Sequence, residues 1–156
     1  RGSPLLLQIF FIYYGLPQVG IRLDPFPAAV IGMSVCAGAY IAEIVRAGIQ
    51  SIDKGQMEAA RSLGMTYFQA MLYVVLPQAY RRLIPPMGNE IIALTKDSSL
   101  VSTLAMVELL RTAKQIDAAT LRSMEAYIAA GLYYLAITTG LTVLFDHVEK
   151  RLAVYE

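Results

Sequence analysis

The chain has 156 residues, of which 56% are hydrophobic and only 16% are charged, whereas a soluble domain averages about 45–50% apolar and about 25% charged residues. Its net charge of +1, without a basic block or basic residues interleaved with aromatic ones, argues against nucleic-acid binding. The single cysteine, Cys36, excludes an intrachain disulfide, and its apolar surroundings predict a packing role.

Three long runs carry no charged residue: Leu5 to Ile21, Phe26 to Ala42, and Ala126 to Phe145. A bilayer core of about 30 Å needs roughly 20 consecutive apolar residues in a helix. Three such runs in so short a chain predict an all-α membrane protein with several spans. The first run lacks a small-residue cleavage site, so it is not a signal peptide. Since the chain begins with Arg1 rather than Met, we expect a segment before it.

The first predicted span runs from Pro4 to Gly15 and on to Gly20, and Gly15-Leu16-Pro17 predicts an end or a kink. The second predicted span covers Phe26 to Ile49. Its small residues recur at four-residue spacing, which predicts a face packed closely against other helices: Ser34, Gly38 and Ala42. Near its end, Glu43 and Arg46 share one helix face, where pairing or a position at the membrane interface is expected.

The polar middle segment predicts two helices joined by a glycine. Asp53, with Gln56 three residues later, predicts a capped start for a short amphipathic helix from Lys54 to Leu63. Gly64 predicts its end in a left-handed conformation. Thr66 and Gln69 form a second capping box, so a new helix should follow at once. This segment is too polar to span and should lie at the membrane surface.

The stretch from Met71 to Leu104 contains Pro77, Pro85 and Pro86, which predict a broken helix. Met106 to Ala119 predicts an amphipathic surface helix, and the last span is predicted from Glu125 or Ala126 to Phe145. Cytoplasmic loops of membrane proteins carry an excess of Lys and Arg. The count of these residues on each side favours the orientation in which the loop from Gln56 to Leu76 is cytoplasmic. In that orientation the inner set is Arg1, Arg46, Lys54, Arg61, Arg81, Arg82, Lys150 and Arg151, the outer set is Arg22, Arg111, Lys114 and Arg122, and Lys96 lies at depth.

The middle segment also carries a motif with long spacing. Glu58-Ala59-Ala60 is followed after three residues by Gly64, and nine residues later stands Val74-Val75-Leu76-Pro77. This resembles the cytoplasmic Glu-Ala-Ala loop of bacterial binding-protein-dependent ABC importer permeases, except that Val74 replaces the isoleucine of the family pattern. Spacing alone favours a capped connecting helix without a partner, and the family pattern reverses that preference.

Flanking segments are similar to the polar amino-acid permeases of that family: Arg1 to Leu6, Ala39 to Glu43, Arg46 to Ile52, Pro77 to Ala79, Gly88 to Glu90, and Lys96 to Leu100. The resemblance covers essentially the whole chain. It implies that residues 1–156 form one transmembrane permease domain with about four of the usual five spanning helices, the first helix of the family core being absent. Residues 53–76 would form the cytoplasmic coupling loop.

The resemblance further implies partners: two ATP-binding subunits, a second identical or different permease subunit, an extracytoplasmic amino-acid-binding protein, the lipid bilayer and an amino-acid substrate. The chain would lie in the bacterial inner membrane with its coupling loop and C-terminus in the cytoplasm. It would bind no cofactor or metal. Because the sequence has no phosphate-binding loop, ATP and Mg²⁺ would belong to the partner ATPase. In the family the loop inserts into a cleft of the ATPase, which implies coupling roles for Glu58, Ala59, Ala60, Arg61, Gly64, Leu76 and Pro77.

Ionisable residues at membrane depth are costly and therefore candidates for function. Lys96 or Arg46 could bind the carboxylate of an amino acid, and Glu90 or Asp97 its ammonium group. Ser98 either lines the path or caps a helix, and Lys96 and Asp97 could instead neutralise each other. An ion-coupled transporter or channel, or a structural membrane module, remains an alternative, although neither requires the loop motif.

Overall fold

The computed structural model describes residues 2–153, and every regular element in that range is helical, as predicted. The α-helices are α1 (Leu5–Phe10), α2 (Pro25–Gln50), α3 (Lys54–Ser62), α4 (Tyr67–Ala70), α5 (Leu76–Asp97), α6 (Leu109–Thr120) and α7 (Ser123–Ala153). Short π-helical segments are η1 (Phe11–Gly15) and η3 (Met71–Val75), and short 3-10 segments are η2 (Leu16–Val19) and η4 (Ser98–Leu104).

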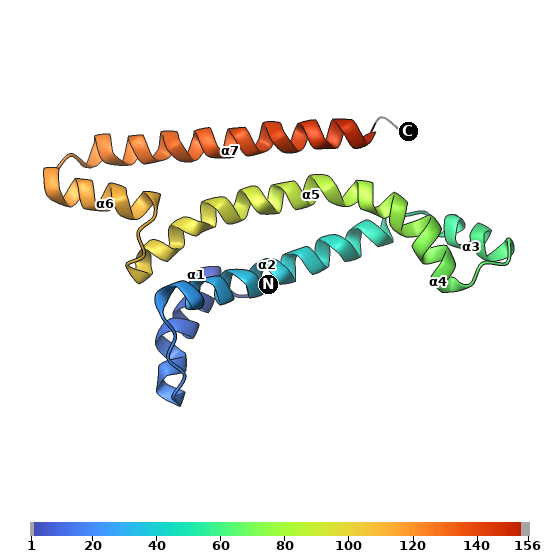
Figure 1. Ribbon diagram of the computed structural model, residues 1–156, viewed down its shortest axis with the longest axis horizontal. Helices are drawn as coiled ribbons and strands as arrows, with labels where there is room; N and C mark the ends of the chain where they lie inside the picture. The colour runs from blue at the N-terminus through green and yellow to red at the C-terminus, as the bar shows by residue number, and fades with distance from the viewer. Residues whose placement is uncertain (1, 154–156) are drawn as a thin grey trace.

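Three long helices, α2, α5 and α7, lie lengthwise beside one another, with α5 in contact with both of the others (Figure 1). The helix α6 folds back along the start of α7, and α1 packs on α2. One end of the long axis carries α3, α4 and the end of α7 (Figure 1). The opposite end carries α6 and the start of α2. The short helices α3 and α4 therefore lie at one end of the long helices, and α6 lies at the other end.

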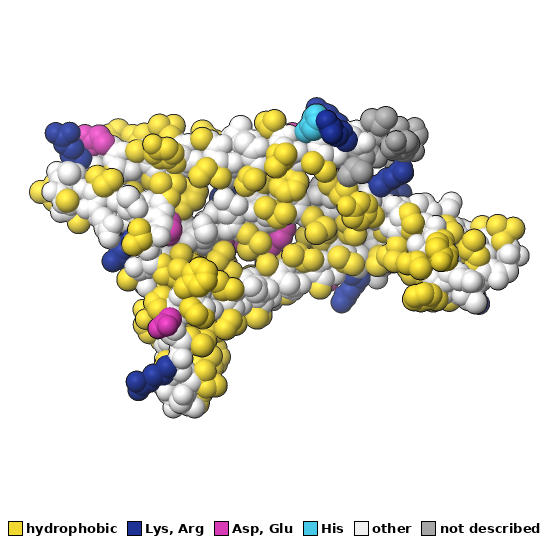
Figure 2. Space-filling model, viewed as in Figure 1, with side chains coloured by type: hydrophobic (Ala, Val, Ile, Leu, Met, Phe, Trp, Pro, Cys, Tyr) yellow, Lys and Arg dark blue, Asp and Glu magenta, His cyan; other side chains and the backbone are white. Residues whose placement is uncertain are grey.

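Within residues 2–153, two helices, α2 and α7, are long and apolar enough to cross a membrane, and Leu5–Val19 forms a shorter apolar helix. Only 28% of the apolar window of α2 and 6% of that of α7 are buried. Hydrophobic side chains accordingly cover much of the visible outer surface of α7 (Figure 2). Such a continuous apolar surface suits lipid or neighbouring membrane helices. The helix α5, with 22 residues, is about 33 Å long and carries the ionisable residues expected at depth.

The first helical segment continues through Pro17, where the sequence predicted an end or a kink. The π-helical turn η1 precedes the 3-10 segment η2, and Pro17 lies in the first turn of η2. A proline there needs no amide donor, because the first amides of a helix have no intrahelical acceptor. The segment ends only at Gly20, whose φ of 90° is left-handed.

The prediction of a broken helix after Met71 is also wrong. From Tyr67 to Asp97 the backbone stays helical, with the π-helical turn η3 placed directly before Pro77. The wider turn lets α5 restart with Pro77 in its first turn, where its missing N–H is not required. Pro85 and Pro86 lie inside α5, and the helix bends gently along its length (Figure 1).

The small residues expected to pack against other helices are not the ones that do so within the described chain. Ser34, Gly38 and Ala42 are exposed, and no described atom beyond the adjacent turns of α2 lies within 4 Å of a Cβ built on Gly38. The packed face of α2 instead contains Gly32 and Cys36. A Cβ on Gly32 would lie 2.8 Å from Ile9 Cγ1. The packing role predicted for Cys36 is confirmed, since it belongs to a buried apolar cluster.

The surface helix predicted from Met106 begins at Leu109, because Glu108 caps it. The Glu108 carboxylate accepts hydrogen bonds from the amides of Leu110 at 2.7 Å and Arg111 at 2.5 Å. The same carboxylate accepts a 2.9 Å hydrogen bond from the hydroxyl of Tyr134. One glutamate therefore both starts α6 and ties it to α7.

Candidate functional site

The start of α3 is set by Asp53, as the sequence predicted. Its side chain accepts a hydrogen bond from the amide of Gly55 at 2.7 Å. Gln56 does not close the cap reciprocally. Instead, its Oε1 accepts a 3.2 Å hydrogen bond from Nε2 of Gln78 in α5. The short helix is therefore capped locally and also held by a residue distant in the sequence.

The turn after α3 has the geometry that its glycine predicted. Gly64 adopts a φ of 90°, and its amide donates to the carbonyl of Arg61 at 3.0 Å. The amide of Met65 donates to the carbonyl of Ala60 at 3.2 Å, which completes a Schellman motif. Thr66 and Gln69 then form both hydrogen bonds of a capping box. Local hydrogen bonds thus fix the angle between α3 and α4.

The helices α3 and α4, joined by the Gly64 turn, form a helical hairpin. Some residues of the motif are buried in this hairpin and others are exposed on its surface. Ala60 is buried, whereas Glu58, Ala59 and Arg61 are exposed. The i,i+3 pairing that Glu58 and Arg61 could have made is not among the ion pairs of the described residues. Both charges and the small Ala59 surface are therefore available to another molecule. Leu76 and Pro77 do not lie on the hairpin tip, since they begin α5 and set where that helix restarts.

The tip of the hairpin also exposes large apolar side chains that the sequence analysis did not single out. Leu63 is 83% exposed and Phe68 is 73% exposed, and Tyr67 and Tyr73 are exposed beside them. Exposure of large apolar side chains to water is energetically unfavourable, so a cluster of them at one end of the molecule is typical of a binding surface (Figure 2). The sequence did contain a signal for this exposure. Leu63 directly precedes Gly64, and Tyr67 and Phe68 lie within the Thr66–Gln69 capping box of an otherwise polar segment.

Two of the predicted substrate-path residues share one cavity of about 490 Å³ between α1, α2 and α5. Glu90 and Asp97 are seven residues apart, which places them about 10 Å apart along one face of α5. The other lining residues include no Lys or Arg: Ser3, Pro4, Leu5, Leu6, Cys36, Tyr40, Ala93, Leu94 and Leu100. The cavity is therefore acidic at two points, with Ser3 and Tyr40 as its other polar side chains.

The cations proposed for the same path lie outside that cavity. Arg46 is exposed and forms a 3.5 Å ion pair with Glu43, as the helix spacing predicted. Lys96 is exposed, and Ser98 ends α5 with its hydroxyl donating to the carbonyl of Thr95 at 2.7 Å. Ser98 therefore does not cap the start of a helix. Among the described residues, no cluster of three His, Cys, Asp or Glu side chains could hold a metal ion.

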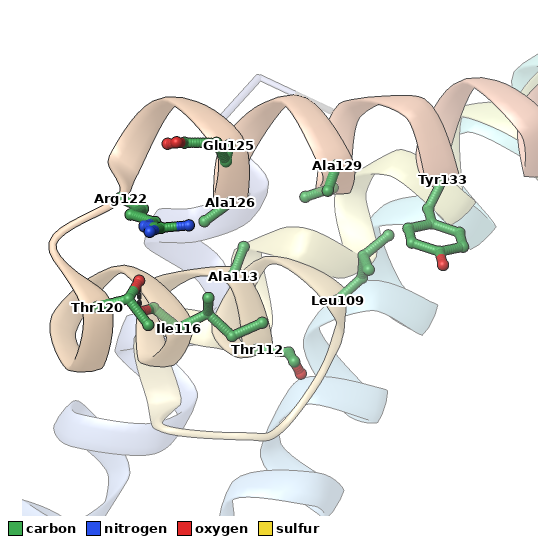
Figure 3. A pocket seen from close by; sticks show the side chains of 11 residues that line it. Leu109, Thr112, Ala113, Ile116, Thr120, Arg122, Glu125, Ala126, Ala129 and Tyr133 are labelled. Atoms are coloured by element: carbon green, nitrogen blue, oxygen red, sulfur yellow. Dashed lines mark hydrogen bonds between the residues drawn. The ribbon is translucent and has the colours of Figure 1, made fainter.

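A second cavity, of about 390 Å³, lies between α6 and α7 at the other end of the molecule. Figure 3 shows that side chains from both helices point into it, with Ala113 and Ile116 on one side and Ala126 and Ala129 on the other. Its only ionisable lining residues apart from Tyr133 are Arg122 and Glu125. The rest of its walls are mainly apolar.

Long apolar helices, an exposed capped hairpin at one end and an acidic cavity between the helices together fit a multi-helix membrane protein. Residues 1–154 match one family model, described as the inner membrane component of binding-protein-dependent transport systems. The chain belongs to that family, and it is an inner-membrane permease component. This membership favours the ABC permease interpretation over an ion-coupled carrier or a structural module.

Curated relatives agree with this assignment. The chain is 47% identical to the probable glutamine ABC transporter permease protein GlnM of Bacillus subtilis, over 97% of this chain and 70% of the relative. It is 44% identical to the arginine transport system permease protein ArtQ of Bacillus subtilis, with the same coverage of 97% and 70%. Identity to the glutamine transport system permease protein GlnP of Escherichia coli is 40%, over 99% of this chain and 71% of GlnP.

A solved structure supports the fold directly. The chain superposes with a TM-score of 0.93 on a chain from the crystal structure of an amino acid ABC transporter with histidines. The two are 44% identical, and the match covers 97% of this chain and 71% of the solved chain. The predicted polytopic permease fold is therefore confirmed.

Proposed function

We propose that this chain is a permease subunit that conducts polar amino acids across the bacterial inner membrane and is driven by a separate ATPase. The observation that carries the proposal is the hairpin of α3 and α4, which presents the family motif at one end of the long helices. The relatives named for glutamine and arginine transport support a polar amino acid as the substrate.

The hairpin has the properties of a docking element. It is fixed by the Gly64 turn and the Thr66 capping box, so little conformational entropy is lost when a partner binds. Leu63 and Phe68 offer exposed apolar anchors, and Glu58 and Arg61 offer unpaired charges beside them. A short amphipathic helix of this kind suits a groove on another protein. We assign that groove to the ATPase subunit, which would bind ATP and Mg²⁺ and leave this chain non-catalytic.

The distribution of cations supports a cytoplasmic hairpin and C-terminus. The end of the long axis that carries the hairpin also carries most described Lys and Arg residues: Arg46, Lys54, Arg61, Arg81, Arg82, Lys150 and Arg151. Arg22, Arg111, Lys114 and Arg122 belong to loops and to α6 at the opposite end, and Arg1 lies outside the described residues. An excess of positive charge marks the cytoplasmic side. The full assembly would comprise two permease subunits, two ATPase subunits and an extracytoplasmic binding protein.

The cavity between α1, α2 and α5 is our candidate for the substrate path. Its two carboxylates, Glu90 and Asp97, can accept charge-assisted hydrogen bonds from the ammonium group of an amino acid. The substrate carboxylate would need a partner from elsewhere, because Arg46 and Lys96 do not line the cavity. In an alternating-access cycle, ATP-driven movement of α3 would change which side this cavity faces, and the two states must bind substrate differently.

Charge reversal and backbone strain on the hairpin test this proposal in the assembled transporter. We expect Glu58→Lys and Gly64→Asp to abolish uptake and coupled ATP hydrolysis while the chain still inserts in the membrane. Gly20→Asp is the matched control, because Gly20 has the same φ of 90° and equally open surroundings but lies at the end of the first helical segment. Normal uptake by the Glu58 and Gly64 variants would refute the proposed coupling.

A further inference from the structure

The start of α5 holds the end of α2 through a side-chain hydrogen bond. Arg82 Nη1 donates to the carbonyl oxygen of Ser51 at 2.5 Å. Ser51 is the C-terminal cap of α2, so its carbonyl lies where a helix leaves acceptors without intrahelical donors. The charged guanidinium supplies a donor there, and hydrogen bonds to charged groups are stronger than neutral ones.

One turn earlier in α5, Gln78 holds α3. Its Nε2 lies 3.2 Å from Gln56 Oε1 and 2.9 Å from the carbonyl oxygen of Val74. Gln78 and Arg82 are four residues apart, which places both side chains on the same face of α5. That face therefore contacts the C-terminal cap of α2 and the first turn of α3.

Apolar packing fills the space between these two polar contacts. Ile52, in the turn between α2 and α3, is buried in a cluster with Val75 and Ala79. Leu83 reaches α2, where a Cβ on Gly48 would lie 2.3 Å from its Cδ2 atom. The first two turns of α5 thus hold the connection between α2 and α3, and α3 itself packs mainly against η3 and α4.

We propose that Gln78 and Arg82 are positioning residues that make the segment from Ser51 to Gln56 move together with α5. A displacement of α3 by a docked ATPase would then pass into α5 and reach Glu90, about 12 Å further along the same continuous helix. This inference rests on the proposed function, since it assumes that α3 is the docking element. It adds the residues that connect the hairpin to the acidic cavity.

The test uses the complete transporter in proteoliposomes, with loaded binding protein supplied outside. The variants are Gln78→Ala, Arg82→Met, which keeps an apolar stem without a donor, and the double variant. Arg82→Lys is the conservative variant because it keeps a cationic donor. Gln50→Ala is the matched control, since Gln50 is an exposed glutamine directly before Ser51. Three quantities are measured: ATPase co-purification, stimulated ATP hydrolysis, and amino acid taken up per ATP hydrolysed.

We expect the double variant to retain the ATPase and its hydrolysis but to lose about tenfold in uptake per ATP, as the loss of one charge-assisted hydrogen bond allows. Arg82→Lys should recover most of that loss, and Gln50→Ala should match the parent. An unchanged uptake per ATP in the double variant would overturn the inference, as would a loss of uptake that only follows loss of the ATPase. Normal coupling in Glu58→Lys and Gly64→Asp would instead overturn the proposed function.

Discussion

Gly88 in α5 lies directly against the ring of Phe145 in α7. A Cβ atom built on Gly88 would stand 2.8 Å from Phe145 Cγ and 3.1 Å from its Cβ. These are atoms near the root of the side chain, so the ring cannot simply turn away. The close contact of α5 with α7, which closes one side of the helix layer, therefore requires glycine at this position.

Gly88→Ala should accordingly destabilise the protein by about 1–3 kcal/mol, the usual effect of overpacking. Thermal unfolding of the detergent-purified transporter measures this. Gly131→Ala in α7 is the control, because no described atom beyond its own turns of helix lies within 4 Å of its Cβ position. An equal melting temperature for Gly88→Ala and Gly131→Ala would show that the contact with Phe145 does not constrain the packing.

Tyr134→Phe should weaken the attachment of α6 to α7. It removes the 2.9 Å hydrogen bond to Glu108 and leaves the amide contacts of Glu108 in place, so a loss of about 1 kcal/mol is expected. Glu108→Ala should cost more, because the cap of α6 is lost as well. Tyr133→Phe is the control, since Tyr133 is 63% exposed. The ranking is checked by thermal unfolding, and equal losses for Tyr134→Phe and Tyr133→Phe would contradict it.

The exposed tip of the hairpin should supply much of the affinity for the ATPase. Leu63→Ala and Phe68→Ala should each weaken ATPase co-purification, by about 1–2 kcal/mol of binding free energy for an apolar anchor. Stability should be unchanged, because both side chains are more than two-thirds exposed. Val107→Ala is the control from the opposite end, where the side chain is 75% exposed. If ATPase binding is undiminished in both variants, neither Leu63 nor Phe68 belongs to the interface with the ATPase.

We expect substitutions of the carboxylates in the acidic cavity to weaken substrate binding without weakening the association with the ATPase. Glu90→Gln and Asp97→Asn should each raise the KM for uptake about tenfold, because a charge-assisted hydrogen bond to the ammonium group is lost. The amount of co-purified ATPase should stay the same. Glu149→Gln, an exposed glutamate near the end of α7, should leave KM unchanged. If KM is also unchanged in both cavity variants, the substrate follows another route.

Local chemistry made the hairpin predictable from sequence. Asp53, Gly64 and Thr66 determine their helix ends through bonds to residues two to five positions away, so their effect is contained in the sequence window itself. Pro17 and Pro77 misled for a related reason. The energetic penalty of a proline depends on whether its amide is needed, and the π-helical and 3-10 turns that remove this need carry no clear sequence signal.

Contacts between distant segments could be predicted only in part. Periodicity placed Glu90 and Asp97 on one face of a helix, and the fold brings that face to a cavity. It could not show that Arg46 would lie outside that cavity, since this depends on how α2 and α5 cross. The packed face of α2 was misjudged similarly. Small residues occur on two of its faces, and only the position of Ile9 in α1 selects the one with Gly32.

Site-directed cross-linking tests most directly whether the hairpin is where the ATPase docks. In a background with Cys36→Ala, Ala59→Cys places a thiol on the exposed side of α3, and Val107→Cys places one at the opposite end of the molecule. Short thiol-reactive cross-linkers applied to the assembled transporter should join Ala59→Cys, but not Val107→Cys, to the ATPase subunit. Cross-linking of the ATPase through Val107→Cys alone would contradict the account.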